Sequence, residues 1–215
     1  MLIALRLALF LLAGTAMLSY LGYAPARLLV RDALRPARLF LLPPLGFCVL
    51  AVGASFLNYL LPMPGVLLVL GLLATTANAW LIRRDRGLAL DQPTHHEVAV
   101  LALAIAAFGA AGIPQVHANT LAFLGVQWDL EIYLPLGEYL KHYAMGGTLQ
   151  AYPNPLLDMM NDPAVRGGSG WGFSYLDAAM GSLLGWGSFE TFRPLLHFVF
   201  ALSAPAVYSL CRWGL

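Results

Sequence analysis

Residues 39–81 read LFLLPPLGFCVLAVGASFLNYLLPMPGVLLVLGLLATTANAWL and contain no Asp, Glu, Lys or Arg. A helix needs about 20 apolar residues to cross the hydrocarbon core of a bilayer, and this stretch is long enough for two such helices. Pro62, Met63 and Pro64 lie at its middle, where they predict a turn. The stretch therefore predicts a hairpin of two membrane spans, residues 39–61 and 64–81.

The whole chain has the composition of a protein that is surrounded by lipid. Of its 215 residues, 60% are hydrophobic and 11% are charged, whereas a soluble domain averages about 45–50% apolar and about 25% charged residues. The mean hydropathy is +0.72. This composition excludes a soluble enzyme or a nucleic-acid-binding module. The two cysteines, Cys48 and Cys211, form no disulfide framework and no metal-binding spacing.

Three further apolar runs, residues 2–21, 98–113 and 194–211, complete a set of five. The run at 98–113 is slightly short and rich in Ala and Gly, which is typical of a span packed inside a bundle. We therefore expect an all-α polytopic transmembrane helix bundle of about five spans. Its expected segments are a four-span membrane bundle, a large extracytoplasmic loop carrying interfacial amphipathic helices, and a fifth span with the cytoplasmic end: residues 1–113, 114–193 and 194–215.

The arginines predict the orientation of this bundle. They cluster between the first two spans, after the third and after the fifth: Arg27, Arg31, Arg35, Arg38, Arg83, Arg84, Arg86 and Arg212. The positive-inside rule places these clusters in the cytoplasm and residues 114–193 on the outer side. We expect an integral protein of a bacterial inner membrane, with this loop periplasmic or extracellular. A signal peptide cleaved near Ala24-Pro25-Ala26 would translocate the first cluster, against the rule.

The long loop contains two stretches with apolar residues at helical spacing, residues 129–143 and 173–186. We expect helices over residues 133–143 and 173–186. Each would be about 16–21 Å long as a helix, too short for a core of about 30 Å. We expect both to lie along the membrane surface. Arg166 precedes a glycine-rich run between them, which is either a plain turn or a phosphate cradle of backbone N–H groups and a guanidinium.

Polar residues near the spans have structural interpretations. Thr94-His95-His96-Glu97 resembles a metal site, but a Thr followed three residues later by Glu is also the pattern of a helix capping box, which we favour. We expect four polar side chains within the spans to form hydrogen bonds between helices. These are Asn58, Thr75, Thr76 and Asn78.

An acidic pair, Asp129 and Glu131, comes after the fourth span and directly precedes the first expected interfacial helix. Two residues apart, the carboxylates would project together only from an extended segment. There they would suit a shared divalent cation or a general base beside an acceptor hydroxyl. The alternative is two solvated acids that favour a helix N-terminus.

Residues 128–136, WDLEIYLPL, resemble the loop signature of the bacterial GT-C membrane glycosyltransferases that are related to protein mannosyltransferases. Residues 173–185 and the span from Pro194 are similar to the segment after that loop in these enzymes, so the resemblance covers about residues 95–211. It implies sugar transfer from a polyprenyl-phosphate donor, a membrane lipid, on the extracytoplasmic side. Asp129 and Glu131 would be the catalytic acids and would also hold Mg²⁺ or Mn²⁺, if a cation takes part.

The resemblance also implies substrate contacts. Arg166 would bind the donor phosphate, and Tyr133, Tyr139 and His142 would contact sugar or prenyl groups. Because the family usually has many more spans, the chain is either the N-terminal portion of an enzyme whose further membrane helices lie outside it, or a non-catalytic polytopic protein. As the latter it would be an assembly partner or a transporter component. Its spans contain almost no ionisable residue beyond Arg6, which disfavours ion-coupled transport.

Overall fold

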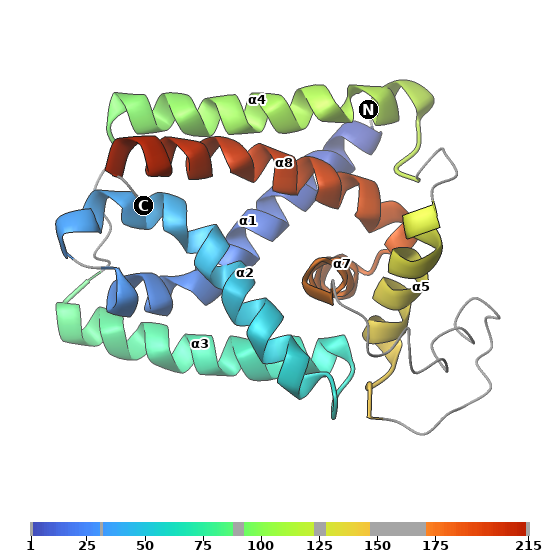
Figure 1. Ribbon diagram of the computed structural model, residues 1–215, viewed down its shortest axis with the longest axis horizontal. Coiled ribbons are helices and arrows are strands. Elements are labelled where there is room, and N and C mark those ends of the chain that lie inside the picture. Colours follow the sequence, from blue (N-terminus) through green and yellow to red (C-terminus); the bar gives the residue numbers. More distant parts are fainter. Residues whose placement is uncertain (1, 31, 88–92, 123–127, 147–170, 214–215) are drawn as a thin grey trace. The chain divides into compact units, whose positions relative to one another are not determined.

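The computed structural model describes residues 2–30, 32–87, 93–122, 128–146 and 171–213. Within them it has seven α-helices, one short 3-10 helix and no strand (Figure 1). Five of the helices are long and apolar enough to cross a membrane. They are α1 (Leu2–Leu29), α2 (Arg38–Leu57), α3 (Met63–Asp85), α4 (His95–Ala118) and α8 (Ser188–Trp213). The prediction of an all-α polytopic bundle with five spans is confirmed.

Helix α4 has 24 residues and is longer than the apolar run that predicted it. It begins at a capping box: the Thr94 hydroxyl accepts a hydrogen bond from Glu97 N, and Thr94 N donates to Glu97 Oε2 at 2.7 Å. This arrangement confirms the capping box for residues 94–97. The helix ends at Asn119, whose left-handed backbone (φ 51°) turns the chain while its N–H bonds the last carbonyls.

The chain divides into two compact units. Unit 1 comprises Met1–Val49, Gly71–Thr120 and Pro194–Leu215; unit 2 comprises Leu50–Leu70 and Leu121–Arg193. Two of the boundaries fall inside α2 and α3, and one falls after α4, between Thr120 and Leu121. The last falls inside α8, between Arg193 and Pro194, which is also where the expected loop ends. The second half of α2 and the first part of α3 therefore belong to the same unit as the long loop.

Helices α1 and α2 touch through their backbones in unit 1. A Cβ atom on Gly22 would overlap Leu42 O, and a Cβ atom on Gly46 would overlap Leu18 O. Because the pairing runs in opposite directions along the two helices, α1 and α2 are antiparallel. Small residues permit this approach, which suits a membrane, where dispersion forces between closely packed helices replace the hydrophobic effect.

Polar side chains join α1 to α3. The Tyr20 hydroxyl is hydrogen-bonded to Thr75 Oγ1, Asn78 Nδ2 donates to Tyr20 O at 3.0 Å, and Arg27 pairs with Asp85. The prediction of bonds between helices is confirmed for Thr75 and Asn78. It is wrong for Thr76, because its hydroxyl donates to Leu72 O of its own helix at 2.9 Å.

Ring contacts place α4 and α8 within unit 1. The Phe198 ring lies 6.3 Å from the Phe10 ring, and the His197 ring lies 6.4 Å from the Phe108 ring. Near the other end of α8, the Trp213 ring lies 6.0 Å from that of Phe40, at the start of α2. Successive helices therefore alternate in direction, as consecutive spans must (Figure 1).

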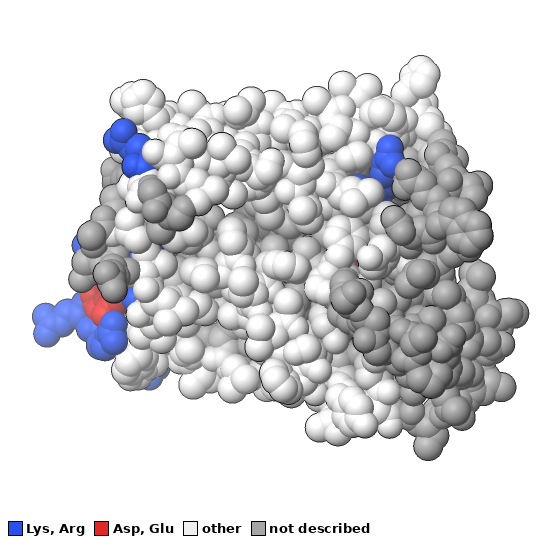
Figure 2. All heavy atoms as spheres, in the orientation of Figure 1, with Lys and Arg blue, Asp and Glu red and all other residues white. Residues whose placement is uncertain are grey.

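Basic side chains gather at the end of unit 1 where α1 and α3 end, as Figure 2 shows. Asp85 accepts from both Arg27 and Arg84, and the Arg84 guanidinium lies 4.9 Å from the centre of the Trp80 ring. We call this region the arginine end. It also includes the start of α2 and the end of α8, because Phe40 contacts Trp213 there.

We predict that Gly46→Val lowers the stability of the bundle by about 3 kcal/mol or more, because the added side chain must separate the α1 and α2 backbones. Gly71→Val in α3 is the control, since a Cβ there meets nothing within 4 Å. Thermal unfolding in detergent measures both. Equal effects of the two substitutions would contradict the backbone contact.

Candidate functional site

Unit 2 is built on the packing of α5 (Trp128–His142) against α7 (Trp171–Leu184). Tyr139, Leu140, Leu176 and Met180 are fully buried in this unit. Both helices are shorter than 18 residues and neither is among the candidate spans. The prediction of two short helices in this loop is confirmed, although α5 begins five residues earlier than expected.

The corner between α7 and α8 is fixed by a glycine and by a lysine from α5. Gly185 has a left-handed backbone (φ 69°), and Trp186 N donates to Gly181 O at 3.0 Å, which ends α7 in a Schellman motif. Lys141 Nζ then donates to Trp186 O at 2.9 Å. Helix α5 is thereby tied to the point where the chain turns toward α8.

Glu138 on α5 connects this corner to the start of α8. Its carboxylate accepts from Lys141 Nζ at 3.1 and 3.2 Å, from Ser188 N at 3.0 Å, and lies 3.1 Å from His142 Nε2. A carboxylate is favoured at the positive N-terminus of a helix. Burial raises the pKa of Glu138, but the hydrogen bond from Ser188 N and the charge of Lys141 together lower it by more than burial raises it. The pKa of Glu138 therefore lies below its ordinary value.

Asp177 on α7 is a fully buried acid near the start of α8. Its Oδ1 accepts a hydrogen bond from the Thr191 hydroxyl at 2.6 Å, whereas Oδ2 has no hydrogen-bond partner among the described residues. A Cβ atom on Gly137 would overlap Asp177 Oδ2 and would lie 2.8 Å from Ser188 Oγ. Gly137 therefore makes the space that the carboxylate occupies.

Burial raises the pKa of Asp177 to about 7, and the hydroxyls of Thr191 and Ser188 lower it less. The acid can therefore bind a proton near neutral pH. Asp177 and Glu138 were not singled out from the sequence. The burial of Asp177 could have been predicted from its position. It shares helical spacing with Phe173, Met180 and Leu184, which form the apolar stripe of α7.

The backbone of Asp129 and Glu131 lies in the first turns of α5. Of the two alternatives for this pair, the backbone fits the position at a helix N-terminus and not the extended segment. Residues i and i+2 of an α-helix are separated by about 200° around its axis. The side chains of Asp129 and Glu131 lie outside the described residues.

The expected substrate-binding residues are spread along α5. Tyr133 follows Asp129 by four residues, on the same helix face, and its ring lies 6.4 Å from that of Phe173. Tyr139 is 1% exposed and its hydroxyl donates to Ala144 O at 3.2 Å. His142 is exposed but lies thirteen residues after Asp129, about 20 Å along the helix. Of these residues, only Tyr133 is near the acid.

Two further expectations fall partly outside the described residues. Arg166 and the glycines at 167–170 lie in a segment that the structure does not describe. Among the residues that it does describe, no three His, Cys, Asp or Glu side chains are grouped as ligands for a metal ion.

Comparison of the chain with protein-family models, with curated proteins and with solved structures finds no match.

We predict that the stability of the protein falls as the pH rises from about 4 to about 7, because the native state holds the Asp177 proton over this range and the unfolded state releases it. A rise of the pKa from 3.8 to about 7 corresponds to about 4 kcal/mol. Asp177→Asn keeps an acceptor for Thr191 and removes the charge. We expect this variant to be more stable than the wild type at pH 8.

Thermal unfolding in detergent between pH 5 and pH 8 measures this dependence. Glu138→Gln is the comparison, because Glu138 has a lowered pKa and its loss should destabilise the protein at pH 8. Two results together would contradict the raised pKa of Asp177. These are a lower melting temperature of Asp177→Asn than of the wild type at pH 8, and a wild-type melting temperature that does not change with pH.

Proposed function

We propose that the chain is a GT-C-like membrane glycosyltransferase, which transfers a sugar from a polyprenyl-phosphate donor to an acceptor on the extracytoplasmic side. The observation that carries the proposal is the placement of Asp129 in the first turn of α5, a helix packed against α7 in the segment between α4 and α8. This order of elements is also the order on which the family resemblance rests.

The helical geometry of α5 narrows the roles of the two acids. Since Asp129 and Glu131 are about 200° apart around the helix axis, one substrate meets one of them. We assign that role to Asp129, because Tyr133 lies one turn further along the same face and can stack on a sugar ring. Glu131 would then carry no part of the chemistry.

In the proposed reaction, the Asp129 carboxylate takes the proton of the acceptor hydroxyl as the acceptor oxygen attacks the anomeric carbon of the donor sugar. The bond from that carbon to the phosphate oxygen breaks, and polyprenyl phosphate leaves with the bonding electron pair. Arg166 would stabilise the charge of this leaving group. Neither step uses a metal ion.

The proposed location follows from the charges. If the arginine end faces the cytoplasm, as the positive-inside rule requires, the short helices α5 and α7 belong to the outer side of a bacterial inner membrane. Nucleotide sugars are normally absent from that side, so a lipid-linked sugar is the appropriate donor.

We predict that Asp129→Asn lowers sugar transfer by about 10²–10⁴-fold, the usual loss when a general base is removed. Glu131→Gln is the matched control and should retain activity within about twofold. The assay is product formation by membranes supplied with a polyprenyl-phosphate sugar, with protein levels matched by blotting.

Two results would overturn the proposal in different ways. Wild-type activity in Asp129→Asn would remove Asp129 from the site, and a larger loss in Glu131→Gln would assign the chemistry to the other face of α5. A wild-type protein without transfer activity would favour the non-catalytic alternative, an assembly partner or transporter component.

A further inference from the structure

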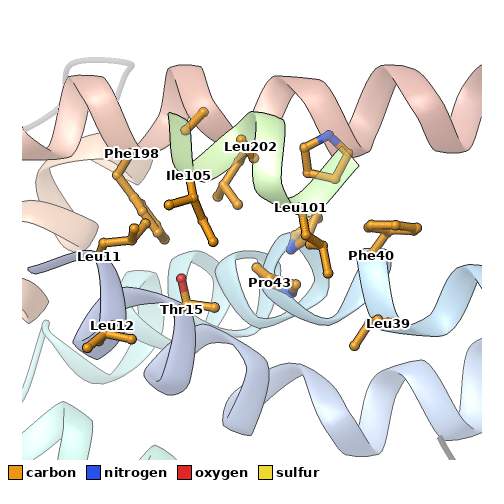
Figure 3. A pocket seen from close by; sticks show the side chains of 14 residues that line it. Leu11, Leu12, Thr15, Leu39, Phe40, Pro43, Leu101, Ile105, Phe198 and Leu202 are labelled. Carbon is orange, nitrogen blue, oxygen red and sulfur yellow. The ribbon is translucent and has the colours of Figure 1, made fainter. Parts of the chain in front are cut away.

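Unit 1 contains an apolar cavity of about 280 Å³ that is lined by α1, α2, α4 and α8 (Figure 3). Thr15 is the one polar residue among the 14 that line it. The lining of α8 extends from Phe198 to Pro205, which is about 10 Å along the helix axis. The cavity therefore has the chemistry of a site for a hydrocarbon chain.

Prolines and alanines account for the space. Pro43, Pro44 and Pro205 lie inside helices and line the cavity. A proline within a helix removes a backbone hydrogen bond and pushes the neighbouring backbone away. Ala104 and Ala201 add little side-chain volume at the same level. Together these residues leave a hollow that neighbouring side chains do not fill.

The cavity opens on a surface that faces lipid. Phe198 and Phe40 are buried at its opposite ends, with exposed fractions of 0% and 3%. Leu12 and Ile105, which also line it, are 68% and 58% exposed. In a membrane, a side opening of this kind is bathed by lipid chains and not by water.

One end of the cavity lies at the arginine end. Phe40 follows Arg38 by two residues, and its ring contacts Trp213, which adjoins the exposed Arg212. The exposed Arg35 belongs to the short helix η1 (Asp32–Ala37), which immediately precedes α2. Tryptophan is favoured at the level of lipid headgroups, and arginine there attracts anionic lipids.

We propose that unit 1 binds one anionic phospholipid, with an acyl chain in this cavity and the phosphate at the arginine end, near Arg35 and Arg212. The charge at that end selects an anionic headgroup over a zwitterionic one. The apolar lining accepts an acyl chain of any phospholipid. The acyl chain therefore contributes affinity, and the arginines contribute specificity for the headgroup. No residue of α5 lines this cavity, and the proposal does not depend on glycosyl transfer.

The test measures the phospholipid that remains on the purified protein. The protein is exchanged into mixed micelles that contain equal amounts of phosphatidylglycerol and phosphatidylcholine, and native mass spectrometry counts the lipids bound to each chain. Ala104→Phe fills the cavity and should lower retention at least fivefold. Ala106→Phe is the matched control on the same helix, because Ala106 is exposed and does not line the cavity.

The headgroup is tested separately. Arg35→Gln and Arg212→Gln should each lower the preference for phosphatidylglycerol by about fivefold, whereas Arg6→Gln, near the other end of α1, should leave it unchanged. Unchanged retention in Ala104→Phe would overturn the acyl-chain site. Equal binding of the two phospholipids by the wild type would overturn the anionic headgroup. Retention of an isoprenoid lipid in place of phospholipid would overturn both the acyl-chain site and the anionic headgroup. It would assign the cavity to the polyprenyl-phosphate donor.

Discussion

The hydrocarbon core of a membrane offers no water to hydrogen-bond the backbone, and the structure depends on this constraint. Every N–H and C=O group that enters the core must be paired within the protein, so the five apolar segments are helices. The same constraint governs their side chains. Thr75 and Asn78 find partners on Tyr20, and Asp85 finds two arginines. Glycines at the α1–α2 crossing then allow contact between backbones.

In unit 2, acidic side chains are buried among other polar groups of the same unit. Glu138 is satisfied by three donors or potential donors and stays ionised, whereas Asp177 has one hydrogen bond and binds a proton near neutral pH. Two acids on neighbouring helices thus have pKa values shifted in opposite directions. The difference arises first from burial, which is complete for Asp177 and partial for Glu138, and then from the number of donors around each carboxylate.

The spans could be predicted from the sequence because hydropathy over about 20 residues reports the environment directly. The capping box of α4 was also predictable, since Thr94 and Glu97 act over one turn. The start of α5 was not, because Pro135 is typical of a first helical turn yet lies well inside this helix. The contact of α5, α7 and the start of α8 around Asp177 could not be predicted. Gly137, Asp177 and Ser188 meet only through tertiary packing, and one sequence carries no signal for that contact.

We propose that the five helices alternate across the membrane, with the arginine end in the cytoplasm and α5 on the outer side. Cysteine accessibility in intact cells tests it most directly, in a chain from which Cys48 and Cys211 have been replaced by alanine. His142 in α5 and His96 in the first turn of α4 are both exposed and form a matched pair of sites. This orientation predicts that a membrane-impermeant maleimide labels His142→Cys in intact cells and labels His96→Cys only after permeabilisation. The reverse pattern, or the same response at both positions, would contradict it.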